Sequence, residues 1–385
     1  MQTLQETIET IREEDATYQR LTADGGNPLR GRQSPEHLSK LAEAARFLQS
    51  ARNGYVSKRR FEEAMTTSDF PQLFTDILDR QLLGNWQAQP SSWQNYMRRA
   101  TVPDFRDVKR FGVDGGTTTL SEVNEKAEYP EDSVSDSVDS YSVRKYGRTF
   151  HISWETMVND DLDALNDFPQ RMATAARRSE EKFATELFVD GSGPHASLYT
   201  GARNNIIDGN PELSIEGLQD GFEQLSSMTD PDGEPISMEM VELVVPPALE
   251  IVAMNILNAT ELRVNNAGGT SNQLVITQNW MRGRLRLNVN YYIPQVASSN
   301  GNTSWFLFAS PGTSRPALEM GFLRGHEEPQ MFRKAPNSNS IGGGEEMFSF
   351  ENDSTAFKLR HVFGGTRYDN TGGWRSTVAS NGSGS

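Results

Sequence analysis

The sequence contains no cysteine. Disulfide bonds and thiolate metal sites are therefore excluded, and the folded state must be stabilised by packing or by assembly. Hydrophobic residues make up only 36% of the 385 residues, which predicts a thin core. A chain of this length forms two or three domains, or one domain with large excursions. We expect part of it to be extended or to bury apolar surface against other subunits.

Long apolar runs and positive charge are also scarce. No segment approaches the roughly 18 apolar residues of a membrane span, and the opening MQTLQETIETIREED lacks the apolar centre of a signal peptide. The sequence thus predicts a protein made in the cytoplasm, with no membrane partner. The chain has 37 Lys and Arg against 52 Asp and Glu, a net charge of −15. Tight non-specific binding of nucleic acid is disfavoured, because an acidic chain repels phosphate.

Catalytic motifs are missing from the sequence. The five histidines show neither HxH nor HExxH spacing, and the glycine-rich segments match no phosphate-binding or nucleophile-elbow motif. Asp160, Asp161 and Asp163 are clustered carboxylates of the kind that a two-carboxylate hydrolase uses. Carboxylates at a strand-to-helix junction also stabilise a helix N-terminus, and we favour that interpretation. We therefore expect no enzyme activity, no cofactor and no metal site.

In the first third of the chain, apolar residues recur at the spacing of an α-helix. Apolar residues predict a helix over 3–21, and a second helix begins at Pro35 after Ser34 as N-cap. Both apolar stripes are narrow, which favours two solvated helices over an arm that docks on a neighbour. A third helix is predicted over 68–83, and its buried face holds Phe74, Ile77, Leu78 and Leu82.

A long β-hairpin is predicted in the next part of the chain. The segment near 105–112 is extended, and the interval 122–139 carries seven carboxylates and one lysine. A strand then runs to Trp154, with Tyr146, Phe150 and Ile152 on its apolar face and His151 and Ser153 on the other. A two-stranded ribbon is marginally stable by itself, so we expect it to need a partner surface.

A long helix and a compact α/β region follow. The helix is predicted over about 164–189, with Asn166 or Asp167 as its cap and Pro169 in its first turn. Beyond it, apolar patterns predict helices at 214–229 and after Pro246, strands at 240–245, 273–278, 284–294 and 304–310, and a closing strand on which Phe357, Leu359, His361 and Phe363 share one face. The last ten residues are small and polar, which is typical of a disordered tail.

The order of these elements resembles the major capsid proteins of tailed bacteriophages, which have the HK97 fold. Three stretches carry the resemblance: TTSDFPQLFTDILDRQLL, YSVRKYGRTFHISWETMVNDDLDAL and STAFKLRHVFGGTRYD. It covers roughly residues 60–370 and implies an α+β fold. It also implies a shell subunit that forms hexamers and pentamers of an icosahedral head around double-stranded DNA, in the virion and, during assembly, in the host cytoplasm.

The resemblance also implies a division of the chain. Residues 1–70 correspond to a helical arm with a scaffolding-like segment, 71–103 to the connection into the body, and 104–154 to the extended loop. The peripheral domain comprises 155–205 and 340–375, with the long helix as its spine, the axial domain comprises 206–339, and the tail is 376–385. The implied partners are other copies of the chain, a portal, a scaffold, a maturation protease and a decoration protein, with DNA enclosed but not specifically bound.

Candidate assembly residues lie in the extended loop and its returning strand, and they are Lys126, Glu128, Glu131, Asp132, Arg144, Arg148 and Trp154. Some members of the family join a loop lysine covalently to an asparagine of the peripheral domain, and Lys126 and Asn352 stand at corresponding places. Two other functions stay open: an encapsulin-like compartment with an enzyme cargo, and the carboxylate-dependent hydrolase.

Overall fold

A computed structural model describes residues 6, 9, 11, 35–52, 55, 60, 64, 70–114, 135–153, 162–229, 240–265, 274–312, 316–334, 349, 352–368 and 377–384. The chain forms two compact units. Unit 1 comprises Met1–Pro90, Lys145–Arg178 and Gly325–Val362, and unit 2 comprises Ser91–Arg144, Ser179–Arg324 and Phe363–Ser385. Each unit is therefore built from segments that are far apart in the sequence.

Unit 1 packs helices on strands. Its elements are α2 (Pro35–Arg52), α4 (Phe70–Ala88), β4 (Arg144–Ser153), the first part of α6 (Leu162–Phe188), β13 (Gln330–Arg333) and the first part of β14 (Ser354–Arg367). Strands β4 and β13 both pair with β14, and β13 does so in antiparallel register. The core lies between these elements and includes Leu41, Leu82, Ala173 and Phe357.

The N-terminal helices differ from expectation. Only Glu6, Glu9 and Ile11 of the segment 3–21 lie within the described residues; they are helical, and Ile11 is buried in the core of unit 1. Helix α2 buries Leu38, Leu41, Ala44, Ala45 and Leu48 in the same core, beside α4. The prediction of a solvated helix was therefore wrong for α2, because its narrow apolar stripe is covered by α4.

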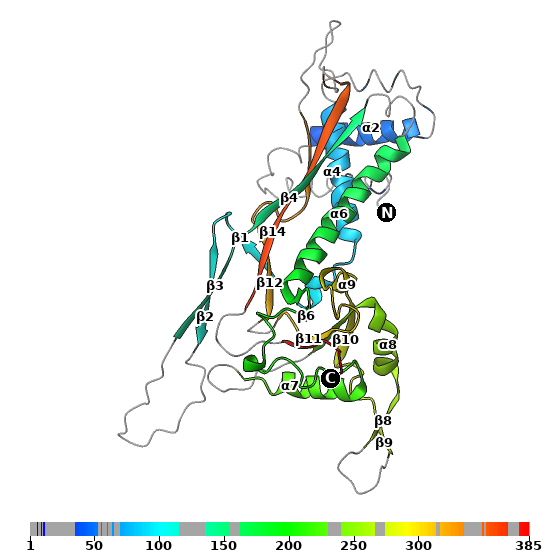
Figure 1. Cartoon of the computed structure of the whole chain (residues 1–385). Helices are drawn as coiled ribbons and strands as arrows, with labels where there is room; N and C mark the ends of the chain where they lie inside the picture. The colour runs from blue at the N-terminus through cyan, green and yellow to red at the C-terminus, as the bar shows by residue number, and fades with distance from the viewer. Residues whose placement is uncertain are drawn as a thin grey trace, which may run out of the picture. The chain divides into compact units, whose positions relative to one another are not determined.

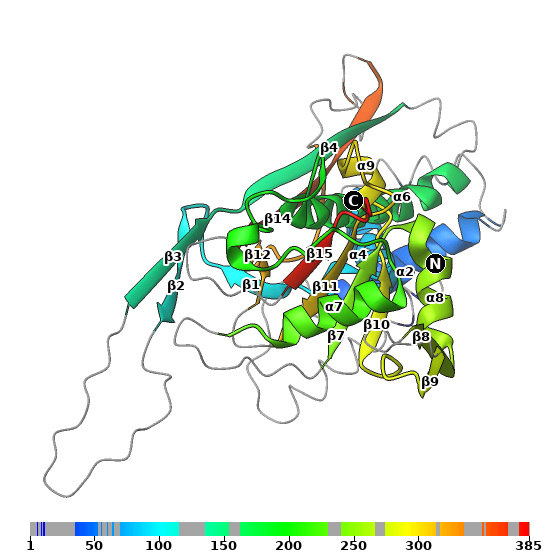
Figure 2. The same cartoon turned by 60° about the horizontal axis from the view of Figure 1, so that its bottom comes forward.

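Unit 2 contains a four-stranded mixed sheet in the order β10-β7-β11-β15, formed by β7 (Val241–Val245), β10 (Leu285–Val289), β11 (Trp305–Ala309) and β15 (Thr377–Ser380). Helix α7 (Ile215–Ser226) contacts β11 and β15 (Figure 2), and Ser214 caps it by accepting a hydrogen bond from the Gly217 N–H at 3.0 Å. The turn η3 (Pro247–Leu249) leads into α8 (Glu250–Asn258), which contacts β10. The helices and strands predicted here are confirmed, except that β10 ends at Val289 and Ile293–Val296 form the short helix α9.

The C-terminal segment of unit 2 is a strand and not a tail. Residues 377–380 are all buried, and β15 pairs with β11 in antiparallel register, with Val378 opposite Leu307. The prediction of disorder over 376–385 was wrong for the described residues 377–384. Small residues are favoured there because the strand fits between β11 and α7, where Thr377 Oγ1 donates to the Leu307 carbonyl at 2.9 Å.

A second sheet segment of unit 2 supports the hairpin. Strand β1 (Arg98–Val102) runs parallel to β12 (Leu318–Leu323), and β12 is antiparallel to the last residues of β14. Strands β2 (Val108–Asp114) and β3 (Ser135–Tyr141) form a two-stranded ribbon (Figure 1). The hairpin is confirmed, but its returning strand is β3. The expected returning strand, β4, pairs instead with β14.

Unit 2 also contains several shorter elements. They are η1 (Trp93–Asn95), β5 (Val189–Asp190), β6 (Gly193–Pro194), η2 (Gly201–Arg203), β8 (Glu261–Asn265), β9 (Leu274–Gln278) and α9 (Ile293–Val296). Strands β8 and β9 form a small hairpin directly after α8.

Helix α6 begins earlier than predicted. It spans 27 residues from Leu162, or about 40 Å at ~1.5 Å per residue, and Pro169 lies inside it. Pro169 cannot donate a backbone hydrogen bond and normally belongs in the first turn. The cost is offset by packing, because Pro169 is buried and Phe168 contacts Phe150 and Phe357, with ring centroids 5.2 and 5.8 Å apart. The expected α+β class and the order of hairpin, long helix, α/β sheet and closing strand are confirmed.

Candidate functional site

A buried carboxylate lies where the β2–β3 ribbon meets β12. Glu319 is the second residue of β12, a strand whose six residues are all buried, and its side chain is 1% exposed. Burying an ionised carboxylate is unfavourable unless charged or hydrogen-bonding groups surround it. Such a residue in an otherwise apolar strand therefore points to a site with a defined set of partners.

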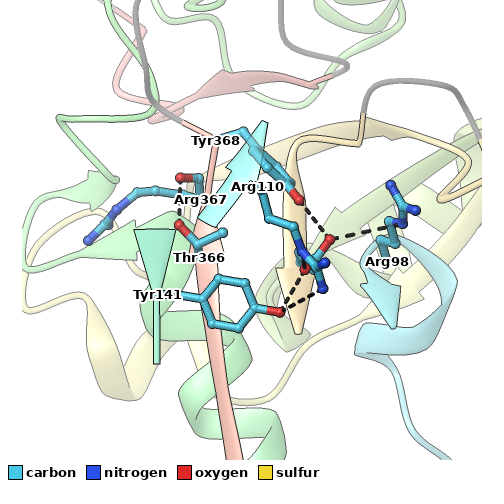
Figure 3. Close-up of polar contacts among 7 residues, drawn as sticks. Arg98, Arg110, Tyr141, Thr366, Arg367 and Tyr368 are labelled. Carbon is cyan, nitrogen blue, oxygen red and sulfur yellow. Dashed lines mark hydrogen bonds and ion pairs between the residues drawn. The ribbon is translucent and has the colours of Figure 1, made fainter. Parts of the chain in front are cut away.

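Four side chains surround this carboxylate (Figure 3). Arg110 Nε donates to Glu319 Oε1 at 2.7 Å, and the Tyr141 hydroxyl donates to the same oxygen at 2.6 Å. The Tyr368 hydroxyl donates to Oε2 at 2.6 Å, and Arg98 Nε lies 3.9 Å from Oε2. Both carboxylate oxygens are thus satisfied by donors. We call these five residues the Glu319 cluster.

The members of the Glu319 cluster come from separate elements. Arg98 lies on β1 directly opposite Glu319, Arg110 lies on β2, and Tyr141 is the last residue of β3. Tyr368 follows the end of β14. Because β2 and β3 each contribute one donor, the cluster fixes both strands of the ribbon to the sheet at their base.

Burial and the contacts with Glu319 shift the pKa values of the neighbouring side chains. Burial raises the pKa of the Tyr141 and Tyr368 hydroxyls above the ordinary range, and their hydrogen bonds to Glu319 raise it further. Burial acts to lower the pKa of the Arg110 guanidinium, but the hydrogen bond and the negative charge of Glu319 outweigh it and the net pKa is raised. All three groups therefore stay in their donor forms throughout the physiological range.

Two glycines permit the close packing around the Glu319 cluster. A Cβ at Gly321 would lie 2.5 Å from the Tyr141 hydroxyl oxygen and 2.7 Å from its ring, so a side chain there would displace Tyr141. A Cβ at Gly364 would lie 2.4 Å from the Ser142 carbonyl oxygen, where the chain passes from β3 to β4. Glycine is required at both positions because another part of the chain occupies the space of a side chain.

A second buried polar network supports the C-terminal half of α6. Glu181 accepts the Ser92 N–H at 2.7 Å and also the Ser92 hydroxyl, while burial raises its pKa. Asn290 Nδ2 donates to Thr185 Oγ1 at 2.9 Å and to the Tyr96 hydroxyl at 3.3 Å. These contacts hold α6 to the segment before β1 and to the end of β10, which is a structural role.

Neither network has the features of a catalytic centre. The Glu319 oxygens are occupied by donors and shielded from solvent, so no substrate reaches them. Within the described ranges, no group of three or more histidine or carboxylate side chains could hold a metal ion. The helices that the structure describes are each too short or too polar to cross a membrane. The Glu319 cluster therefore has a structural role: it fixes the base of the β2–β3 ribbon to β12.

Only some of the candidate site residues predicted from the sequence lie within the described residues. Lys126, Glu128, Glu131, Asp132 and Trp154 lie outside the described residues, as do Asp160 and Asp161. Asp163 is the second residue of α6, so of the three clustered aspartates it alone is placed.

Three residues predicted for assembly or for the cross-link are also placed, and none belongs to the Glu319 cluster. Arg144 and Arg148 are exposed on β4. Asn352 precedes β14 and is exposed, and its Oδ1 accepts the hydroxyls of Ser349 and Ser354. The cross-link between Lys126 and Asn352 stays a prediction, because Lys126 lies outside the described residues.

Comparison with known proteins gives a family match. The model of a family described as "Phage capsid protein" matches residues 137–376, well over half of the chain. A comparison with curated proteins finds no match.

Several solved structures are similar over most of their length. A protein of Microbacterium phage Oxtober96 has 10% identity and a TM-score of 0.46, over 76% of this chain and 90% of that one. A protein of Mycobacterium phage Patience has 15% identity and a TM-score of 0.44, over 82% and 90%. A virus-like particle from Pyrococcus furiosus has 11% identity and a TM-score of 0.41, over 80% and 98%.

Proposed function

Because the chain belongs to the phage capsid protein family, we propose that it forms the wall of a tailed-phage head as hexamers and pentamers arranged in an icosahedral shell. Its role as a structural subunit of a capsid follows from the family. The number of subunits per ring and the enclosure of double-stranded DNA are the parts that we propose.

The β2–β3 ribbon carries this proposal. Among the described residues it pairs with no third strand, so each strand presents one edge of backbone donors and acceptors. Phe111 and Val138 stand directly opposite each other across the ribbon, and they are 64% and 37% exposed. An isolated ribbon with an exposed apolar pair is marginally stable in water. A neighbouring copy of the chain would supply the surface that covers this pair.

The Glu319 cluster supports the same proposal. A ribbon that contacts a neighbour must leave its own subunit at a defined angle, or the contact would not repeat from copy to copy. Arg110 and Tyr141 hold the two strands to one buried carboxylate. We assign the ribbon to the extended loop, α6 to the spine helix, and the sheet β10-β7-β11-β15 with α7 and α8 to the axial domain.

Replacing the apolar pair tests the ribbon contact. In Phe111→Ser/Val138→Ser we expect subunits that fold normally but close into particles with a yield at least about tenfold lower, because the lost burial exceeds the ~1.4 kcal/mol that a tenfold change requires. Lys109→Ser is the matched control, since Lys109 is an exposed residue of β2. Electron microscopy and gradient sedimentation give the yield, and an unchanged yield for the double variant would refute the contact.

The contents of the particles test the enclosure of DNA. Assembly should be run with a portal, a scaffold and a maturation protease supplied, and a decoration protein can be added afterwards. Extracted particles should contain double-stranded DNA, which places the protein in the virion. Particles that hold an enzyme cargo and no DNA would favour the encapsulin-like compartment.

Six charged residues and one tryptophan of the extended loop remain proposed assembly contacts, and they are Lys126, Glu128, Glu131, Asp132, Arg144, Arg148 and Trp154. A covalent bond between Lys126 and Asn352 would leave ladders of linked subunits on a denaturing gel of mature particles. Bands of monomer alone would exclude it.

A further inference from the structure

The sheet in unit 1 is covered by helices on one side. Strands β4 and β13 both pair with β14, which lies beside β4 in Figure 1. Successive side chains of a strand point to opposite sides of a sheet. Phe357 and Leu359 of β14 and Met331 of β13 lie in the core with residues of α2, α4 and α6. The side chains that alternate with them therefore point away from these helices, and we call this side the outer face.

The outer face is rich in positive charge. All charged side chains of β4, β13 and β14 are Lys or Arg, although the whole chain has a net charge of −15. Lys358 and Arg360 alternate with the core residues of β14, and they are exposed and half-buried. Lys334 follows β13 and is exposed, and its N–H donates to the Ala356 carbonyl of β14 at 2.8 Å. The charge balance of the chain is thus reversed on this face.

An aromatic ring orders the cations of the outer face. Phe332 lies directly opposite Lys358 in the pairing of β13 with β14. Lys358 Nζ and Arg360 Cζ lie 5.1 and 4.5 Å from the centroid of the Phe332 ring. Arg360 Nη2 also donates to Gln330 Oε1 at 2.8 Å. These contacts leave the positive charges in place but restrict the side chains, so binding an anion costs less conformational entropy.

Carboxylates in this part of unit 1 gather beside α4. Asp79 of α4 lines a hollow of about 350 Å³ together with Glu327 and Glu328, which precede β13. Asp79 Oδ1 accepts the N–H of Met331 at 2.8 Å, and the Met331 side chain lies in the core. Negative charge therefore collects on the side of the sheet that the helices cover, and positive charge on the outer face.

From this arrangement we propose that the outer face binds the phosphate backbone of double-stranded DNA. The inference rests on the proposed function, because it names a surface through which the shell would contact the DNA that it encloses. Contacts of Lys and Arg with phosphate need no base sequence, so they suit DNA that is enclosed without specific recognition. A duplex carries one negative charge per about 1.7 Å of its axis. Cations spread over two strands of a sheet fit this broad, regular charge better than they fit a short acidic peptide.

Binding of a duplex to unassembled subunits tests the proposal. Lys334→Gln/Lys358→Gln removes two exposed cations of the outer face. Lys40→Gln/Lys182→Gln is the matched control, because it removes the same charge from exposed positions on α2 and α6. We expect the wild type and the control to bind a fluorescent duplex of mixed sequence in low salt. The outer-face variant should bind at least about tenfold more weakly, and the slope of log affinity against log salt should fall by about 2.

The same measurement separates DNA from a protein partner. Wild-type subunits that bind no duplex, or an equal loss of affinity in both double variants, would overturn the proposal. Equally tight binding of a poly-glutamate peptide with the same number of charges would also overturn it, because the outer face would then suit an acidic protein. Urea unfolding checks that both double variants fold.

The absence of native cysteine gives a second readout in assembled particles. Thr149 is exposed and precedes Phe150, which packs against the core, so Thr149 lies on the outer face. Thr149→Cys with a thiol-bound photo-crosslinker should attach to DNA inside filled particles. Ser39→Cys, at an exposed position on α2, should attach at least about tenfold less. If particles contain DNA but attachment is equal at both positions, or absent at position 149, the proposed function stands and the outer-face contact falls. Wild-type particles without DNA would overturn both.

Discussion

Glu319 is buried away from water, so its carboxylate depends on the side chains around it for hydrogen bonds. Its side chain lies in a buried strand, and its two oxygens accept hydrogen bonds from Arg110, Tyr141 and Tyr368. The net gain of a buried ion pair over an apolar packing is small, but removing one member leaves the others without their partner. The Glu319 cluster should therefore be sensitive to single substitutions.

Glu319→Gln tests this sensitivity. The amide keeps the shape of the side chain but removes the negative charge to which Arg110, Tyr141 and Tyr368 donate hydrogen bonds. We expect the free energy of unfolding to fall by about 2–4 kcal/mol, less than for a fully buried pair because Arg110 is 33% exposed. Urea titration of unassembled subunits measures it, with Glu216→Gln on the exposed side of α7 as control. A change below about 0.5 kcal/mol would show that the cluster contributes little.

The environment of Glu242 should make the free energy of unfolding depend on pH. It lies buried on β7, its Oε2 has no hydrogen-bond partner among the described residues, and Arg286 Nε is 3.8 Å from Oε1. Burial raises its pKa from 4.5 to about 7, although the positive charge of Arg286 acts to lower it. Between these values the folded state binds more protons than the unfolded state, so the contribution of Glu242 falls as pH rises through this window.

Glu242→Gln should remove this dependence. At pH 8 the variant should be more stable than the wild type by about 1–3 kcal/mol, because no charge has to be buried. At pH 4 the two proteins should differ little. Unfolding measured at both pH values checks the sign, and a variant that is less stable at pH 8 would contradict the assignment.

Among the elements, those with a strong local pattern were predictable from the sequence. Helices α4 and α7 have clear apolar stripes, and strands β7 and β11 are continuous apolar runs. Strand β15 was missed because its sequence, TVAS, has no large apolar residue, and its burial depends on β11. The start of α6 was misplaced because packing around Phe168 overrides the usual position of proline.

The Glu319 cluster could not be predicted for a related reason. Its members share no motif, and Arg110 and Glu319 are separated by 209 residues. The one local signal was a glutamate inside the apolar run LEMGFL. Such a residue is either paired or incompatible with a buried strand, but the sequence does not tell which cations and hydroxyls reach it.

A substitution in β15 tests whether this strand is needed for the sheet. Val378→Asp places an unpaired carboxylate in the core between β11 and α7, where Val378 is fully buried. We expect insoluble or protease-sensitive protein. Ser383→Asp, at an exposed position beyond the strand, should remain soluble and resistant. A soluble, protease-resistant Val378→Asp subunit would mean that β15 is not needed for the sheet.

At the scale of the whole molecule, the family match confirms the expected relationship to the major capsid proteins of tailed phages. The absence of cysteine and the excess of negative charge then have a common interpretation. We expect a subunit without disulfides to gain stability from the surface that it buries against its neighbours, and we expect its net negative charge to slow association.

Salt should therefore control assembly. With a net charge of −15, subunits repel over distances comparable to the Debye length, which is about 30 Å at 0.01 M salt and about 8 Å at 0.15 M. We expect the assembly rate, followed by light scattering, to rise as salt increases over this range. A rate that falls would indicate that surfaces of opposite charge dominate the contacts between subunits.

The 209-residue separation between Arg110 and Glu319 also sets an order of events in time. Contacts between distant parts of a chain form slowly, because the entropy of closing a long loop is lost before the contact stabilises anything. The ribbon strands are local and can pair early, but they become anchored only when β12 has taken its place. A newly made subunit thus acquires a firmly held ribbon only once that part of its body has folded, and we expect the proposed ribbon contact with a neighbour to be delayed until then.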